Sequence, residues 1–469
     1  MKVLAAIAWC TLIACGQAVA GSAQDEKFSA SVQSLTRDLT IPGVAFAVVR
    51  DGKVVSTGAL NASTDGPQLT LETPLRWASV TKTLTAVALM RAVDRGELSL
   101  DDSVAKWLPD FAVRPQITVR QLAAHVSEGT PGTEFVYATQ RYAKLAPILE
   151  KATKTGFEEL LRKEIVSPLH MNWYDSPDLG AHAGLVSTVK DMTSFVQALQ
   201  RNTLVSQKRF DEMTAPYRLP AGAAPVGVGF FAQQIGGARV VWSFGQDDPD
   251  HSSALLLMLP RQKIALVMLA NTDELSNPFR LLMGDVRYSP FATAFLDAYA
   301  PDVAKGITER ERAAQAALIG VWNQDHERAT QQFRRFAALG APRADDLVPH
   351  FIATMVGDAE SREFNERLDR AVMAAHPGNR WALLMSGGLN ERLEHLETAA
   401  AQYQTLIALP NQEQDGLAKL FQAWSYAGLA RVASVNDRKL ALKYVEQGLA
   451  TGVTGGTRED LVRLQKSLE

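Results

Sequence analysis

A serine lies three residues before a lysine at the predicted start of a long helix. These residues are Ser79 and Lys82. Residues three apart on a helix share a face, so helix geometry alone would hold the serine hydroxyl beside the lysine amine. A serine hydroxyl is a weak nucleophile until a base removes its proton. Lysine can be that base only where burial or the positive end of a helix dipole disfavours its charged form. The pair therefore favours a fold that shields this helix start from water.

The residues after this pair support the helix prediction. Ser-x-x-Lys alone is a short pattern that large proteins contain by chance. Here apolar residues recur at helical spacing and predict one buried face: Ala86, Leu89, Met90 and Val93. Gly96 is suited to end the helix in a left-handed cap. The pattern thus predicts a helix that runs from the serine to this glycine.

This segment resembles the serine beta-lactamase and penicillin-binding superfamily, specifically its class C and serine esterase branch. Three later stretches, 117–127, 131–137 and 183–192, resemble landmarks of that family in the same order. Such collinearity, over about residues 28 to 298, is far more specific than one motif. The resemblance implies a two-lobed α/β fold, with an antiparallel sheet flanked by helices, an all-helical lobe and the active site in the cleft between the lobes.

The resemblance also implies roles for single residues. Ser79 would form an acyl-enzyme, Lys82 would accept or relay its proton, and Tyr137 would shuttle protons during acylation and deacylation. Taken alone, Tyr137 would be read as a buried aromatic. The backbone N–H groups of Ser79 and Gln246 would form the oxyanion hole. His125 lies where the family often has a structural histidine.

Two motifs depart from the family pattern. Residues 137–139 read Tyr-Ala-Thr where the family has Tyr-x-Asn, so Thr139 offers one hydroxyl in place of an amide. Residues 243–245 read Ser-Phe-Gly where the family has Lys or His, any residue, then Gly245. Ser243 would hold a substrate carboxylate less well than a cation. These departures weaken the case for beta-lactams and for peptides with a free carboxylate, and leave esters and simple amides open.

These residues predict a serine hydrolase, of carboxylesterase or D-amino-acid peptidase or amidase type. The alternative is a non-catalytic beta-lactamase-like protein that binds a cell-wall fragment, a peptide or a protein partner, an interpretation that the altered motifs favour. A net charge of −3 gives no basic surface for nucleic acid. No two-histidine helical pair occurs, so no metal or other cofactor is expected. His251 is expected to have a loop role or to contact the substrate. Turn and helix-start chemistry explains the acidic residues: Asp101, Asp102, Asp247, Asp248 and Asp250.

The N-terminus has the pattern of an export signal. Lys2 precedes an apolar run, and Ala18-Val19-Ala20 fits a cleavage site after residue 20. Equally, residues 12–15 resemble a lipoprotein box in which Cys15 would be lipidated and anchor the protein to an envelope membrane. A retained apolar helix is the third interpretation. Either export interpretation predicts a periplasmic or secreted protein. The second cysteine, Cys10, also lies in this segment, which leaves none in the mature chain.

The remaining pattern divides the chain in two. Residues 21–300 form the predicted hydrolase domain, with strands at 43–49 and 53–57 joined by an Asp-Gly turn, later strands at 226–234, 238–244, 253–259 and 264–269, and a helix at 276–298. Residues 301–469 are predicted to be all-α. A capping box at 308–311 opens this region, and further helices are expected near 327–339, 360–375, 392–409, 416–431 and 438–450. One helical pair loosely resembles a tetratricopeptide unit. The region is either an appendage of the hydrolase or a surface for a protein partner.

Overall fold

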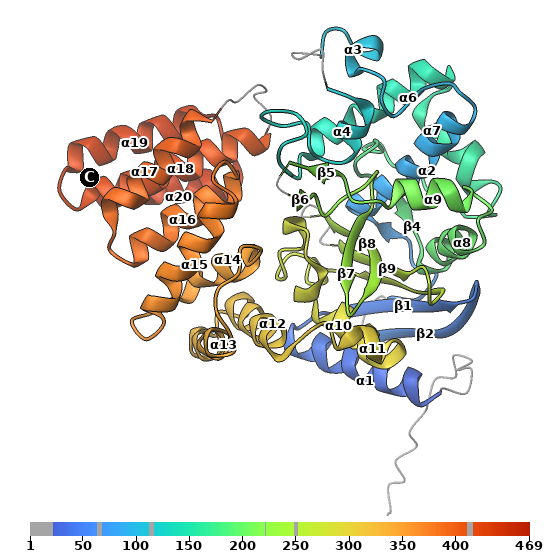
Figure 1. The fold of residues 1–469 in the computed structure, drawn as a ribbon, viewed down its shortest axis with the longest axis horizontal. Coiled ribbons are helices and arrows are strands. Elements are labelled where there is room, and N and C mark those ends of the chain that lie inside the picture. Colours follow the sequence, from blue (N-terminus) through green and yellow to red (C-terminus); the bar gives the residue numbers. More distant parts are fainter. Residues whose placement is uncertain (1–21, 63–67, 112–116, 221, 248–251, 410–415) are drawn as a thin grey trace, which may run out of the picture.

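The computed structural model describes residues 22–62, 68–111, 117–220, 222–247, 252–409 and 416–469 (Figure 1). Several predictions lie outside the described residues: the export signal with Cys10 and Cys15, Asp248, Asp250 and His251. No helix in the described ranges is long and apolar enough to cross a membrane.

A six-stranded antiparallel sheet forms the centre of the first domain, in the order β2-β1-β10-β9-β8-β7. Its strands are β1 (Gly43–Arg50), β2 (Lys53–Asn61), β7 (Phe231–Ile235), β8 (Ala238–Asp247), β9 (Ser252–Leu259) and β10 (Ile264–Ala270). The predicted first hairpin is confirmed: Asp51 and Gly52 both take positive φ, as a tight turn between twisted strands requires. The first and the last strands of the chain segment pair directly, β1 against β10, which closes the domain.

Alternate residues of β1 serve two different cores because side chains on a strand point to opposite faces. Phe46 and its neighbours of the same parity pack with α1 (Ala23–Asp38) and α10 (Pro290–Tyr299). Ala47 and its neighbours pack with α2 (Thr81–Asp94) and α8 (Val189–Gln200). The predicted antiparallel sheet flanked by helices is therefore present.

An all-helical lobe lies beyond α2, as expected (Figure 1). It contains α3 (Val104–Trp107), α4 (Val119–Ala123), α5 (Thr139–Ala143), α6 (Leu145–Thr153), α7 (Phe157–Leu161), the π-helical turn η2 (Arg162–Val166) and α9 (Gln207–Met213). Short strand pairs β3 (Leu75–Arg76) with β4 (Val186–Ser187), and β5 (Arg218–Leu219) with β6 (Gly222–Ala223), connect it to the sheet.

The helix that follows the serine is buried almost all round. The sequence predicted one buried face, but the structure buries Thr81 to Met90 without a break. The sheet covers one side of α2 and the helical lobe covers the other, so even its threonines are inside. Thr83 and Thr85 donate their hydroxyls to carbonyls of the preceding turn, which satisfies them there. Gly96 has φ +70 beyond the helix end, as predicted.

Two predicted elements are wrong in extent. The helix expected at 276–298 is instead two 3₁₀ turns, η3 (Leu281–Met283) and η4 (Val286–Tyr288), followed by α10. Gly284, at φ +88, breaks the path between the turns. The strand expected from residue 226 begins at Phe231, because a turn closed by the Gly227 N–H and the Phe230 carbonyl precedes it.

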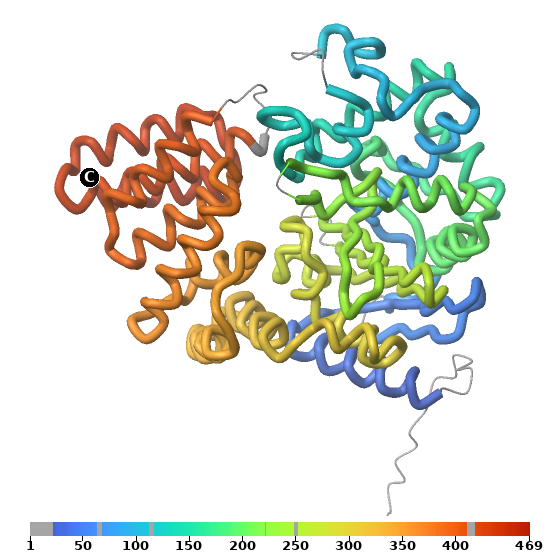
Figure 2. Tube along the Cα trace, in the orientation of Figure 1, coloured from blue at the N-terminus to red at the C-terminus, as the bar shows by residue number. Residues whose placement is uncertain are grey.

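The C-terminal region is all-α in its described residues, as predicted. Its helices are α11 (Pro301–Ala304), α12 (Glu309–Trp322), α13 (His326–Ala338), α14 (Leu347–Val356), α15 (Arg362–Ala375), α16 (Arg380–Arg392), α17 (Leu396–Ala408), α18 (Gly416–Ser434), α19 (Arg438–Ala450) and α20 (Gly455–Leu468). Figure 2 shows the orange and red part of the chain, from α14 on, folding back and forth on one side of the sheet domain. The capping box at Thr308 and Glu311 is present. The tetratricopeptide likeness and the boundary at residue 300 stay predictions.

One hydrophobic core crosses that boundary. The cluster on the α1 and α10 face of the sheet continues through α12, α13 and α14 to Leu393 at the end of α16. The helices after α16 form smaller clusters of their own, one of which contains Phe421 of α18. The first half of the helical region is thus packed into the same core as the sheet.

Candidate active site

Ser79 lies in η1 (Ala78–Val80), a 3₁₀ turn directly before α2. This turn packs on β8 and β9. A Cβ atom on Gly245 of β8 would lie 2.3 Å from the Trp77 carbonyl oxygen, so only glycine allows this approach. The Ser252 hydroxyl of β9 donates to the Arg76 carbonyl at 2.9 Å. The sheet therefore fixes the serine against the end of β8.

Lys82 is held beside the serine by two hydrogen bonds. Its Nζ donates to Ser79 Oγ at 2.9 Å and to the His182 carbonyl at 2.8 Å. Its side chain is 3% exposed, and this burial lowers the pKa of Lys82 to about 7. A lysine with such a pKa is largely neutral in mildly alkaline water and can take a proton from the serine hydroxyl. The amine therefore meets the condition stated for a lysine base, namely that burial disfavours its charged form.

The segment that supplies the His182 carbonyl is tied to α2. Thr85 Oγ1 donates to the Ala181 carbonyl at 2.8 Å, and the Leu185 N–H donates to Thr81 Oγ1 at 3.1 Å. Gly184 has φ +95 and lies so close to the Asp178 carbonyl that a Cβ would be 2.4 Å from it. Sequence reasoning missed His182. It directly precedes the 183–192 landmark, which was the available signal.

Tyr137 stands over the lysine. Lys82 Nζ lies 5.0 Å from the centroid of the Tyr137 ring, and the centroids of the Tyr137 and Phe244 rings are 5.5 Å apart. Burial raises the pKa of Tyr137 above its usual value, and a hydrogen bond with Ser79 opposes that effect. The phenol therefore stays protonated at neutral pH and can donate a hydrogen bond.

His125 positions the loop that carries Tyr137. Its Nδ1 accepts the Ala138 N–H at 3.1 Å, and its ring stacks on Tyr142 at 5.1 Å. Burial and the nearby Lys82 charge lower its pKa well below the usual value, so the imidazole is neutral. Tyr142 in turn donates its hydroxyl to the Lys82 carbonyl at 3.0 Å. The histidine contacts other site residues but not the serine in the described structure, in keeping with a structural role, and Tyr142 is a contact that sequence reasoning missed.

The two departing motifs lie at the rim of this group. Thr139 begins α5, and among the described contacts the lysine amine bonds to Ser79 and His182 rather than to Thr139. Ser243 is buried on β8, on the strand face that Gly245 shares. Gln246, the expected second oxyanion donor, is in register with Ser253 of β9. The structure thus gathers Ser79, Lys82 and Tyr137 closely and sets the third motif on the adjoining strand.

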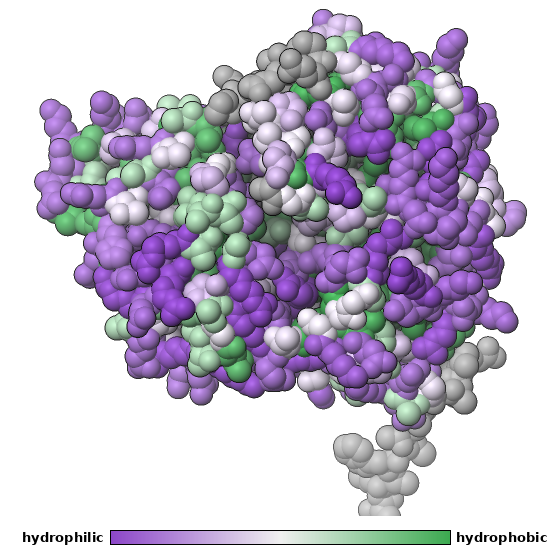
Figure 3. All heavy atoms as spheres, viewed as in Figure 1, coloured by the Kyte–Doolittle hydropathy of each residue, from purple (hydrophilic) through white to green (hydrophobic). Residues whose placement is uncertain are grey.

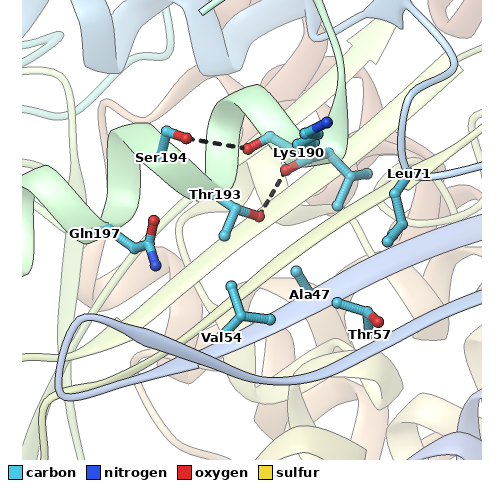
Figure 4. A pocket seen from close by; sticks show the side chains of 9 residues that line it. Ala47, Val54, Thr57, Leu71, Lys190, Thr193, Ser194 and Gln197 are labelled. Atoms are coloured by element: carbon cyan, nitrogen blue, oxygen red, sulfur yellow. Dashed lines mark hydrogen bonds between the residues drawn. The ribbon is translucent and has the colours of Figure 1, made fainter. Parts of the chain in front are cut away.

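A pocket on the sheet and the acidic residues of the sequence were the alternative candidates for a functional site. A pocket of about 170 Å³ between β1, β2 and α8 is lined by none of these residues (Figure 4). Its Thr193 hydroxyl bonds to a carbonyl of its own helix and its Lys190 pairs with Glu72, so its polar groups are already satisfied. Asp102 accepts the Ser99 N–H, as turn chemistry predicted. The described residues contain no histidine, cysteine or carboxylate cluster able to hold a metal ion.

Comparisons with known proteins agree with this fold. The family model described as Beta-lactamase matches residues 28–282. Penicillin-binding protein 4 of Amycolatopsis lactamdurans is 26% identical over 276 residues, which are 46% of this chain and 71% of that protein. Esterase EstB of Burkholderia gladioli is 36% identical over 99 residues, 19% of this chain and 25% of that one. The octameric penicillin-binding protein homologue of Pyrococcus abyssi superposes with a TM-score of 0.51 at 21% identity, covering 62% of this chain and 81% of its own.

Proposed function

The chain belongs to the beta-lactamase family, and from that premise we propose that it is exported and cleaves neutral esters or simple amides through an acyl-enzyme on Ser79. It is a serine hydrolase: the family match spans the nucleophile, the base and the tyrosine. One observation supports the proposed chemistry above all. The amine of Lys82 is buried, has its pKa lowered to about 7 and lies 2.9 Å from Ser79 Oγ.

The proposed reaction moves one proton along this group. Ser79 Oγ attacks the acyl carbon while its proton passes to Lys82 Nζ, which gives a tetrahedral oxyanion. The N–H groups of Ser79 and Gln246 are the proposed donors to that oxyanion. Collapse breaks the bond to the leaving group, which receives its proton from the lysine through the Tyr137 hydroxyl. A water molecule then attacks the acyl carbon while its proton passes to the neutral Lys82 Nζ. Collapse breaks the bond between the acyl carbon and Ser79 Oγ, and Lys82 returns that proton to Ser79 Oγ as the acid product leaves.

The rim of the site favours an uncharged acyl group. Ser243 offers no positive charge where a substrate carboxylate would need one. Phe244 of the same strand packs on the Tyr137 ring, with centroids 5.5 Å apart, so an aromatic side chain lies beside the proposed proton relay. An ester with an uncharged acyl group needs no cation at the Ser243 position. The esterase among the relatives supports this choice of substrate class.

Active-site labelling tests the proposal directly. The intact mass of residues 21–469 would be measured after treatment with a fluorophosphonate, with Ser79→Ala and Lys82→Ala in parallel. We expect one adduct on the parent chain, mapped to Ser79, and none or little in the variants. Labelling that persists in Ser79→Ala, or no labelling at all, would contradict the catalytic proposal and favour a binding protein. A panel of nitrophenyl esters, D-amino-acid amides and beta-lactams then defines the substrate.

Export is proposed from the leader alone. Its basic residue, apolar run and small-residue cleavage site support a periplasmic or secreted protein, with lipidation at Cys15 as the alternative route. The mass of the mature N-terminal peptide from cells distinguishes the outcomes. A chain starting at Gly21 indicates a soluble form, a diacylglyceryl Cys15 an anchored form, and an intact Met1 contradicts both.

A further inference from the structure

A cavity of about 390 Å³ lies where the helical region meets the sheet domain, away from the catalytic residues. Its walls come from the η3 turn beside the sheet and from α14, α16, α17, α18 and α20 of the helical region. Side chains that matter for its chemistry are Arg280, Leu282, Phe351, Trp381, Leu384 and Trp424. In Figure 3 the surface is hollowed along this boundary, and apolar residues gather beside the hollow.

The apolar part of the cavity is aromatic and rigid. The Trp381 and Trp424 rings lie 6.1 Å apart at 42°, and both pack on Phe421 behind them. Leu282 and Leu384 add aliphatic surface to the lining. Rings fixed in this way offer a large contact area to a flat or extended apolar group at little entropic cost. The walls fit a hydrophobic ligand body.

Most charged groups at the cavity are already paired. Arg431 makes two hydrogen bonds to Glu391, at 2.8 and 2.9 Å, and the Tyr403 hydroxyl donates to the same carboxylate. Asp460 pairs with Arg463. These groups form part of the wall and have no charge left uncompensated.

Arg280 is different. The face of its guanidinium stacks on Phe351, with Cζ 4.3 Å from the ring centroid. Its Nη1 donates to Asn277 Oδ1 at 3.1 Å, while its buried Nε has no hydrogen-bond partner. Throughout the described ranges no carboxylate lies within ion-pair distance of it. Burial lowers its pKa, and the more distant Asp273 opposes that effect. Stacking uses only the flat face of an arginine and leaves its N–H edge for a planar anion.

We infer that this cavity binds a hydrophobic monocarboxylate, with its apolar body against Trp381 and Trp424 and its carboxylate on the N–H edge of Arg280. A carboxylate matches that edge with two parallel hydrogen bonds, which fix its direction as well as add affinity. Because Nε is buried in this structure, the proposed pairing requires the guanidinium to turn its Nε toward the cavity. A neutral ligand would gain the same apolar contacts but would leave the cation unpaired. The site therefore selects for the acid over its alcohol.

The test compares two ligands that differ only at the charged end. Calorimetric titration of the full chain, previously capped at Ser79 with a fluorophosphonate, would use 4-phenylbutyrate and 4-phenylbutan-1-ol. If labelling fails, the uncapped chain is used, so the test does not depend on the proposed hydrolysis. We expect the acid to bind at one site at least tenfold more tightly than the alcohol. Arg280→Gln should abolish that preference, whereas Trp381→Ala should weaken both ligands by a similar factor.

Matched variants keep the result interpretable. Arg367→Gln removes an exposed arginine on α15 and should leave both affinities unchanged. Arg280→Lys keeps the positive charge but loses the planar pair of N–H donors, and it should retain part of the preference for the acid. Circular dichroism melts show whether each variant is folded. No binding of the acid at millimolar concentration, or equal loss in the Arg280 and Arg367 variants, would overturn the inference.

Discussion

At the scale of single residues, the lowered pKa of Lys82 sets the pH dependence of the enzyme. In the proposed mechanism the neutral amine is the base, so the active fraction should grow as pH rises through about 7. We expect kcat/KM for a neutral ester to increase about tenfold per pH unit below that value and to level off above it. A stopped or continuous ester assay between pH 5 and 9 measures the profile.

Of three other groups with shifted pKa values, only one titrates in the same range as the lysine. Burial and the Lys82 charge lower the pKa of His182 to about 4, and His125 lies well below its usual value, so both are already neutral. Burial raises the pKa of Glu134 to about 7, which overlaps with Lys82. Glu134→Gln should therefore leave the inflection in place. Its disappearance in that variant would assign the inflection to the carboxyl group.

The tyrosine gives a second prediction at this scale. Tyr137 keeps its proton because burial raises its pKa, so it relays protons but does not activate Ser79. Tyr137→Phe should lower kcat for ester hydrolysis by about 10²- to 10⁴-fold. Fluorophosphonate labelling of Ser79 should continue, at a reduced rate, because the lysine remains. Equal loss of labelling and turnover would instead make the tyrosine part of the activating base.

At the scale of elements, one glycine sets the distance between β8 and the nucleophile. Gly245→Ala would place a methyl group 2.3 Å from the Trp77 carbonyl oxygen, and either the strand or the η1 turn must move. A displacement of about 1 Å at a reacting group can cost about a hundredfold in rate. We expect a loss of that size in kcat/KM for the ester assay.

A glycine in open space provides the comparison. A Cβ on Gly378 would meet no atom within 4 Å, and its φ is not positive, so Gly378→Ala should leave activity unchanged. Activity of Gly245→Ala close to the parent value would show that the strand can shift without disturbing Ser79. The close packing of β8 on η1 would then not be needed for catalysis.

The strands were easier to predict than the helices. Short apolar runs and the Asp-Gly turn located β1, β2, β9 and β10 to within a few residues, because those signals are local. The α14, α16 and α20 helices were missed. Helix α14 is nearly all apolar, and α16 has two consecutive glycines, Gly387 and Gly388, in its middle. Gly387 is there because the Tyr403 ring packs where its side chain would be, a contact no local pattern reveals.

The site shows the same division between local and distant information. The spacing of Ser79 and Lys82 predicted their hydrogen bond because the two lie on one turn. The burial that lowers the lysine pKa needed the sheet on one side of α2 and the lobe on the other. His182 lies 100 positions from Lys82 and acts through its backbone, so its side chain gave no signal. Sequence could locate the chemistry here but not the surroundings that tune it.

At the scale of the whole molecule, the shared core predicts that the sheet domain and α12 to α16 unfold together. A buried ion pair in that region offers a direct test. Arg310 bonds to both oxygens of Asp346, at 2.9 and 2.7 Å, and both side chains are 3% exposed. Asp346→Ala leaves the arginine charge buried and unpaired, which typically costs about 3–5 kcal/mol of unfolding free energy.

Urea unfolding followed by two probes would measure this loss of unfolding free energy. It would also show whether the loss extends from the helical region to the catalytic site. Far-ultraviolet circular dichroism reports the helices, and fluorophosphonate labelling reports the geometry at Ser79. In Asp346→Ala both midpoints should fall together, because the core around α1 and α10 continues into α12 and α14. Asp302→Asn, which removes an exposed partner of Lys305, should leave both midpoints unchanged. The opposite result would be that Asp346→Ala keeps the parent urea midpoint for labelling but loses its helical signal at lower urea. The helical region would then unfold as an independent unit on which the catalytic domain does not depend.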